Sequence, residues 1–219
     1  MTTKPTLGVL IPAYNEQGTV GSVARIALTA GLGPVLVVSD GSRDRTPDMA
    51  RSAGARVLHL EQNRGKGGAV AAGVAALDTD LVLLLDADLT GLTPEHLRDL
   101  ADPVLSGAAD TTVGIFSGGR ARTALAQKIA PGLSGQRVIS RALLAGIEDL
   151  STTKYAIELA INRAVESGHL RVQHVPLEGV AQVMKEEKHG VAGGFARRLR
   201  MYWQILRYAA RGRPRAGQS

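Results

Sequence analysis

Short runs of apolar residues alternate with longer amphipathic stretches over the first half of the chain. The apolar runs predict strands, and the amphipathic stretches between them predict helices at about Val20–Ala30, Thr46–Gly54 and Gly65–Leu77. The expected strands are Gly8–Pro12, Val35–Ser39, Val57–Leu60 and Leu81–Leu85. Unbroken apolar runs indicate strands that are buried on both faces, as in parallel sheets. Strand and helix in regular alternation predict a mostly parallel α/β sheet with helices on both faces.

The second half has a less regular pattern. It predicts a helix over residues 95–106, a strand over Thr111–Ile115 and a loop with a short helix over Phe116–Leu133. Two further helices and a late strand are expected at Ser140–Ala145, Lys154–Ser167 and Leu170–Pro176. Residues 195–211 place an apolar stripe opposite several Arg, which predicts a basic amphipathic helix. We therefore expect one Rossmann-like domain over residues 1–190 and a C-terminal helix and tail over residues 191–219.

Composition excludes several classes of protein. The 219 residues include no Cys, so disulfides, thiolate metal sites and thiol nucleophiles are absent. No stretch approaches the roughly 18 to 20 apolar residues of a membrane-spanning helix, and a cytoplasmic protein is expected. Seven Arg and no acidic residue occur in residues 195–219; subtracting them from the net charge of +6 leaves −1 for the rest. The charge pattern does not indicate a groove for nucleic acid. The basic tail instead indicates contact with the anionic inner face of a membrane.

Two carboxylates follow the buried strand Leu81–Leu85 directly. Asp86 and Asp88 are two positions apart, so both can point to the same side where the strand ends. Open parallel sheets bind ligands at this edge, and paired carboxylates suit Mg²⁺ or Mn²⁺ shared with a diphosphate. The structural alternative is that Asp86 caps a turn and Asp88 caps the helix that starts near Thr93.

Three other polar clusters end predicted strands on the same edge: Ala13–Glu16, Asp40–Ser42 and Asn63–Gly67. Each alone is a favoured turn sequence, but four on one edge predict a shared ligand site. The glycines around Lys66 do not form a P-loop, because that motif requires Gly where this chain has Leu60 and Ser or Thr where it has Gly67. Lys66 can still supply a positive charge to an anion.

Taken in order, these segments resemble the signature of glycosyltransferase family 2. The segments are Ile11–Glu16, Val38–Asp44, Asn63–Gly67 and Asp86–Asp88, and the resemblance extends over about residues 7–180. It implies a GT-A fold, a nucleotide-sugar donor and inversion at the anomeric carbon. It also implies site residues: Pro12, Ala13, Tyr14 and Glu16 around the nucleoside, Asp40 on the base, Lys66 near the diphosphate, Asp86 and Ala87 near the ribose, and Asp88 on the metal.

Later residues resemble the acceptor side of bacterial members of this family, including those that act on polyprenyl phosphate or phosphoglycerate. Arg137 and Arg141 are expected one helical turn apart, so both could bind an acceptor phosphate; alternatively they pair with Glu148 or Asp149. Glu158 is the candidate general base for a hydroxyl acceptor and Asp149 the second choice, whereas a phosphate acceptor needs no base. His189 matches a metal ligand of some relatives, and its alternative is an exposed loop residue.

The sequence therefore predicts a metal-dependent inverting glycosyltransferase. Its catalytic residues would be Glu158, Lys66 and Arg137, its metal ligands Asp88 and His189, and its cofactor Mg²⁺ or Mn²⁺. A sugar-phosphate nucleotidyltransferase and a nucleotide-sugar-binding protein without catalysis are the alternatives. The C-terminal helix is expected to dock on the core, to form a homodimer or to contact a membrane where a lipid-phosphate acceptor lies.

Overall fold

A computed structural model of the chain describes residues 4–117, 134–147, 150 and 157–183. They contain one seven-stranded sheet with the order β3-β2-β1-β4-β7-β6-β8. Its strands are β1 (Leu7–Ala13), β2 (Val35–Asp40), β3 (Arg56–Leu60), β4 (Leu81–Leu84), β6 (Thr111–Ser117), β7 (Arg137–Ser140) and β8 (Val172–Glu178). Only β7 runs antiparallel to its neighbours, β4 and β6. The predicted, mostly parallel α/β sheet is confirmed.

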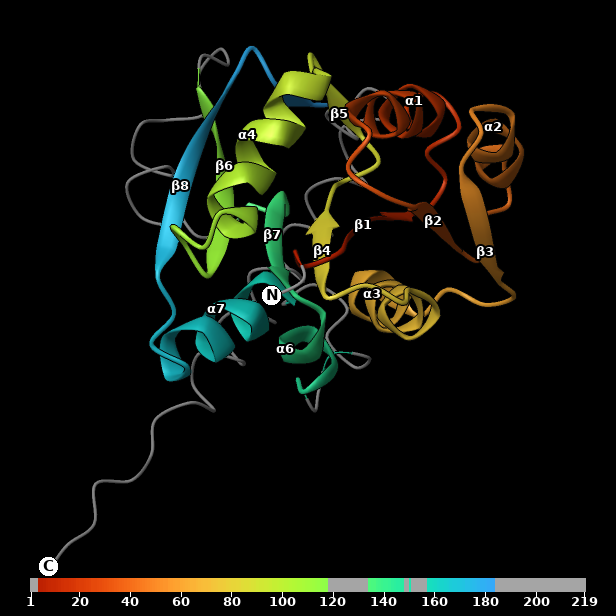
Figure 1. The fold of residues 1–219 in the computed structure, drawn as a ribbon. Coiled ribbons are helices and arrows are strands. Elements are labelled where there is room, and N and C mark those ends of the chain that lie inside the picture. Colours follow the sequence, from red (N-terminus) through yellow and green to blue (C-terminus); the bar gives the residue numbers. More distant parts are fainter. Residues whose placement is uncertain (1–3, 118–133, 148–149, 151–156, 184–219) are drawn as a thin grey trace, which may run out of the picture. The chain divides into compact units, whose positions relative to one another are not determined.

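Helices cover both faces of this sheet (Figure 1). One face carries α1 (Val20–Ala30), α2 (Thr46–Ser52) and α4 (Pro94–Leu105), and the other carries α3 (Gly65–Ala76), α6 (Arg141–Ala145) and α7 (Ile157–Ser167). Two separate apolar clusters fill the two interfaces, with Val9 and Val37 of the sheet on one side and Leu10 and Leu36 on the other. Because strand residues alternate between faces, continuous apolar runs supply both clusters at once.

Three short strands differ from the expectation. β7 lies inside the sheet, between β4 and β6, although it has only two apolar residues, Val138 and Ile139, both fully buried. β5 (Leu89–Thr90) and β9 (Ala181–Gln182) pair in a separate two-stranded sheet. The predicted helix start near Thr93 is correct, because the Thr93 hydroxyl accepts the His96 N–H and caps α4. Asp88 therefore does not cap this helix.

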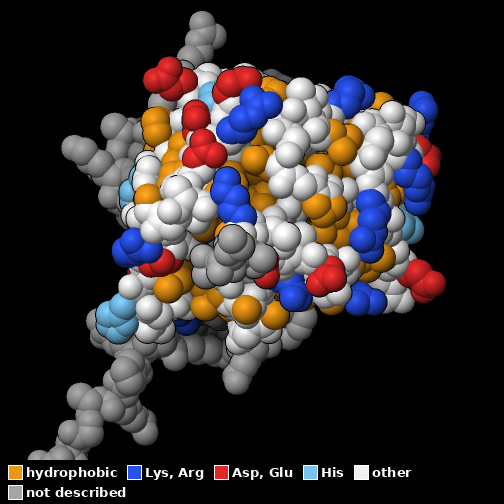
Figure 2. All heavy atoms as spheres, in the orientation of Figure 1, with side chains coloured by type: hydrophobic (Ala, Val, Ile, Leu, Met, Phe, Trp, Pro, Cys, Tyr) orange, Lys and Arg blue, Asp and Glu red, His pale blue; other side chains and the backbone are white. Residues whose placement is uncertain are grey.

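The surface has no single dominant charge in the view of Figure 2, where basic and acidic side chains are interspersed. Within the described ranges, none of the helices has the length and apolar character needed to cross a bilayer. The chain divides into Met1–Val183 and Met184–Ser219. The second unit, which includes the predicted C-terminal helix, lies outside the described residues, so the boundary after residue 190 stays a prediction.

Candidate active site

The first two loops at the carboxyl edge of the sheet are joined by hydrogen bonds. The Asn15 backbone N–H donates to the Ser42 hydroxyl at 3.1 Å, and the Asn15 side chain accepts the Arg43 N–H at 3.0 Å. One residue further on, the Glu16 N–H donates to the Thr46 hydroxyl at 2.7 Å. Asn15 has a positive φ of 54°, a conformation that Asn tolerates better than most residues. The loops after β1 and β2 therefore form one unit.

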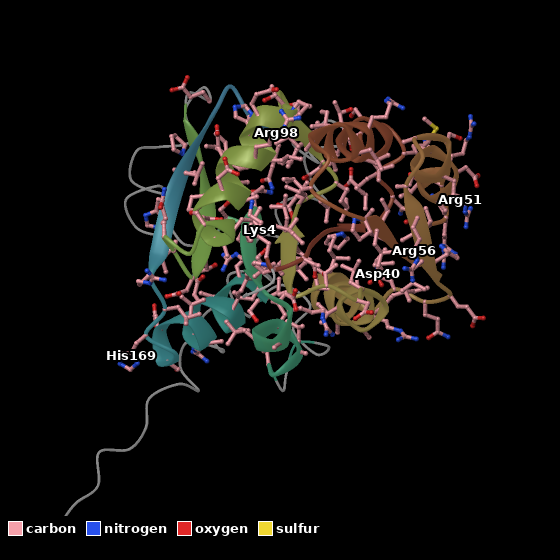
Figure 3. All side chains as sticks on the ribbon, in the orientation of Figure 1. Lys4, Asp40, Arg51, Arg56, Arg98 and His169 are labelled. Atoms are coloured by element: carbon pink, nitrogen blue, oxygen red, sulfur yellow. The ribbon has the colours of Figure 1, made fainter. Side chains whose placement is uncertain are left out.

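Asp40 joins the second loop to the third. Its side chain is 3% exposed, and its Oδ1 accepts the Arg64 N–H at 2.7 Å, directly before α3 begins. The Asn63 side chain donates to the Asp40 carbonyl at 3.1 Å. Asp40 lies beside α3 in Figure 3, whereas the labelled Arg51 and Arg56 lie on the outside of the molecule.

Lys66 joins the third loop to the fourth and to α7. Its Nζ is 2.6 Å from Asp86 Oδ1 and 2.6 Å from Glu158 Oε1, 92 residues along the chain. Burial disfavours the ammonium, but the two carboxylates outweigh that penalty and raise the pKa of Lys66 above its ordinary value. Lys66 is thus held in its charged form at the sheet edge.

Two amides complete the surroundings of Asp86. Gln136 Nε2 and Gln182 Nε2 both donate to Asp86 Oδ2 at 2.8 Å. Burial alone would raise the pKa of Asp86, yet Lys66 and these amides hold it below its ordinary value. Gly135 lies so close that a Cβ there would be 2.6 Å from Asp86 Oδ2, so only glycine fits at this position without a shift.

Asp88 is half-buried in the loop between β4 and β5, and its carbonyl accepts the Val183 N–H at 3.0 Å. Its carboxylate provides the oxygen donors that Mg²⁺ and Mn²⁺ prefer. Among the residues that the structure describes, no three His, Cys, Asp or Glu side chains form a metal-holding group. A cation that keeps water and shares diphosphate oxygens fits so sparse a donor set, since it needs only one or two carboxylates.

The expectation that Arg137 and Arg141 share a helix face is wrong. Arg137 is the first residue of β7 and pairs with Leu84 at the carboxyl edge, whereas the Arg141 N–H donates to the Asp80 carbonyl at the opposite end. The side chain of Arg137 is 1% exposed and donates to Asn162 and to the Ser134 carbonyl. Burial lowers the pKa of Arg137, partly offset by Glu158 and Asp86. The two Arg cannot bind one phosphate together.

The nucleoside-side candidates also lie on this edge. Pro12 and Ala13 end β1, Tyr14 is 38% exposed and Glu16 is 4% exposed. Ala87 is buried between Asp86 and Asp88. His189, Glu148 and Asp149 lie outside the described residues. The four polar clusters do meet at one edge, while the individual roles of their residues stay predictions.

Sequence reasoning missed Gly135, Gln136 and Gln182. Gly135 and Gln136 stand just before a strand too short to predict, and Gln182 lies in the two-residue strand β9. The segment Leu133–Arg137 resembles the acceptor side of the family, but its polar residues around Gly135 are equally typical of a loop.

The fold and the edge together define an α/β protein in which a half-buried lysine, held by two carboxylates, lies beside an acidic loop. The chain belongs to glycosyl transferase family 2, whose family model matches residues 8–177. It is therefore a glycosyltransferase, and the family prediction is confirmed. This membership also argues against the sugar-phosphate nucleotidyltransferase alternative.

Two relatives illustrate the similarity. A dolichyl-phosphate hexose transferase of Haloferax volcanii is 32% identical over 208 residues, with 87% of this chain and 90% of that protein covered. A glucosyl-3-phosphoglycerate synthase of Mycolicibacterium paratuberculosis is 38% identical over 112 residues, which cover 47% of this chain and only 34% of that protein.

Solved structures show the same fold. Glucosyl-3-phosphoglycerate synthase of Mycobacterium tuberculosis in complex with Mn²⁺, UDP and glucosyl-3-phosphoglycerate has a TM-score of 0.67 at 27% identity, with 82% of this chain and 72% of that chain covered. Another structure of the enzyme holds Mg²⁺ and UDP, with a TM-score of 0.68. The predicted GT-A fold is confirmed, and the predicted cofactor agrees with the ions that these relatives bind.

Proposed function

We propose that the chain is a metal-dependent glycosyltransferase that moves a hexose from a nucleoside diphosphate sugar to a polyprenyl phosphate. The observation that carries the proposal is the charged Lys66, fixed by Asp86 and Glu158 beside the loop of Asp88. Lys66 and the carboxylate of Asp88, which can hold a cation, therefore lie near each other on the carboxyl edge of the sheet. This arrangement suits a leaving diphosphate, which gains negative charge as the glycosidic bond breaks.

In this proposal Lys66 holds the departing diphosphate, and Asp88, with His189 as the second predicted ligand, holds the divalent cation. When bound, the cation neutralises charge on the leaving group. Tyr14, Asp40 and their neighbours orient the nucleoside on the joined loops after β1 and β2. The acceptor oxygen then attacks the anomeric carbon in line, which inverts its configuration.

The position of Glu158 supports a phosphorylated acceptor. Its carboxylate accepts a hydrogen bond from Lys66 at 2.6 Å, so it is engaged in holding that lysine. A phosphate oxygen is already ionised at neutral pH and needs no general base. A relative that matches 87% of this chain over 90% of its own length is named for dolichyl phosphate, which favours a lipid phosphate over phosphoglycerate. We also propose that the protein works at the cytoplasmic face of a membrane.

Turnover with defined donors and acceptors tests the proposal. The purified chain with Mn²⁺ would receive uridine, guanosine or thymidine diphosphate sugars together with either dolichyl phosphate or 3-phosphoglycerate. We expect nucleoside diphosphate release and sugar in the lipid extract only with the lipid phosphate, and an inverted anomeric signal by NMR. Transfer to phosphoglycerate alone would show that the proposed acceptor is wrong. If no donor and acceptor pair released a nucleoside diphosphate, the proposed activity would be rejected.

The variant Asp88→Ala identifies the metal carboxylate. We expect it to lose nearly all turnover while keeping the wild-type circular dichroism spectrum, because the leaving group loses its cation. Asp99→Ala, on the exposed side of α4, is the matched control and should keep full activity. If Asp88→Ala keeps its turnover in the presence of a chelator, the reaction does not require a divalent cation.

A further inference from the structure

We propose that Gln182 is a positioning residue for Lys66 and acts through the carboxylate of Asp86. The two oxygens of that carboxylate have different partners: Oδ1 faces Lys66 Nζ at 2.6 Å, and Oδ2 accepts the two glutamine amides at 2.8 Å. A carboxylate only accepts hydrogen bonds, so the NH₂ group of Gln182 must face it. Rotation of the Asp86 carboxylate would break contacts on both sides at once.

Gln182 is itself anchored to the loop that it stabilises. It lies in β9 opposite Leu89 of β5, and the next residue, Val183, donates to the Asp88 carbonyl. Gly91 lets the two segments approach, since a Cβ at this position would be 2.1 Å from the Gly179 carbonyl oxygen. The β5–β9 pair thus fixes where the Gln182 amide stands relative to Asp86, and Asp86 in turn fixes Lys66.

Gln136 makes the same contact but is a poorer residue to test. It is fully buried, and its side-chain oxygen Oε1 accepts a hydrogen bond from the Ser134 hydroxyl at 2.8 Å. Substitution there would remove the hydrogen bond from Ser134 as well as the one to Asp86, so the two losses could not be separated. Gln182 is half-buried, so Gln182→Leu removes the amide at nearly constant size. Gln173→Leu, on an exposed position of β8, is the matched control.

The primary test needs no donor or acceptor. Lysines would be acylated with limiting acetic anhydride and quantified by mass spectrometry, with the exposed Lys4 as internal reference. An ammonium held between two carboxylates reacts slowly, because only the neutral amine is nucleophilic. We expect Lys66 to react several-fold faster in Gln182→Leu than in the wild type or in Gln173→Leu. Equal rates in all three proteins would overturn the proposal, whether or not the proposed function holds.

The kinetic consequence rests on the proposed function. Loss of one hydrogen bond to a charged group should lower kcat/KM for the donor about 10-fold, with little change in KM for the acceptor. In a Lys66→Met background, Gln182→Leu should add no further loss, because it acts only through Lys66. Additive losses would indicate a merely structural role and contradict the proposal. Gln182→Ala serves as the second variant if the leucine variant does not fold.

Discussion

At the scale of residues, the site depends on charges that satisfy one another. Lys66, Asp86 and Glu158 come from three distant segments, and each would be costly to bury alone. The sequence pointed to Lys66 and Asp86 because they follow predicted strands, and to Glu158 through the family resemblance. It could not indicate Gln136 or Gln182, because an amide has no distinctive pattern and its partner is known only once the chain is folded.

An exposed pair offers a test of charge on stability. Asp110 accepts hydrogen bonds from the side chain and backbone of Arg171, which lower the pKa of Asp110 to about 2. A lowered pKa means that the pair stabilises the fold above the unfolded pKa of about 3.9 and ceases to do so as the pH falls through about 2. Asp110→Asn should therefore be less stable than the wild type at pH 6, and the difference should shrink towards pH 2.

Urea unfolding at several pH values between 6 and 2 would measure that difference. Asp48→Asn removes an exposed pair within one helical turn of α2 and should give a smaller change at pH 6. A gap between Asp110→Asn and the wild type that stays constant down to pH 2 would show that the Arg171 contact does not depend on the charge of Asp110.

At the scale of elements, regular β-α units were predictable and short strands were not. β1, β2 and β4 each contain three or four apolar residues in a row, which are enough to identify a buried strand, and β3 was expected from Val57, Leu58 and Leu60. β7 has two, and β5 and β9 are two residues each, so their pairing depends on tertiary contacts rather than on local preference. β7 also explains why Arg137 and Arg141 cannot bind one phosphate together. The strand separates them, so that they lie at opposite edges of the sheet.

The β5–β9 pair can be tested through its glycines. Gly91 has a φ of +72°, and its Cβ would collide with the Gly179 carbonyl, whereas Gly107 has a φ of +76° with nothing within 4 Å. Gly107→Ala should cost about 1 kcal/mol for backbone strain alone. Gly91→Ala should cost about 1–3 kcal/mol more and should also lower turnover, because β9 moves. Equal losses in denaturant melts would show that the close approach is unimportant.

At the scale of the whole molecule, the seven-stranded sheet with a helical layer on each face extends from Leu7 to Glu178 in the residues that the structure describes. The order of the polar clusters along the chain was sufficient to predict the parallel part of this sheet and the edge where the clusters meet, because each cluster follows a parallel strand. The family model ends at residue 177, well before the basic C-terminal segment. That segment lies outside the described residues, and its amphipathic pattern remains the basis for predicting membrane contact.

Vesicle flotation tests the membrane prediction. The full chain should float with vesicles that contain anionic lipid and should float less at high salt, because Arg side chains near a charged surface supply the attraction. A chain truncated after Gly194 should stay at the bottom of the gradient, and neutral phosphatidylcholine vesicles serve as the control. Equal flotation of both chains would assign any membrane contact to residues 1–194.

Under the proposed function, the hydrogen bonds between the loops after β1 and β2 have a consequence for changing the donor. Asn15 and Glu16 depend on Ser42, Arg43 and Thr46, so neither loop keeps its conformation if the other is exchanged. Chimaeras that import a different nucleobase preference from a relative would have to transplant both segments as a matched pair. Exchange of either one alone should yield a protein with no preference at all rather than a new one.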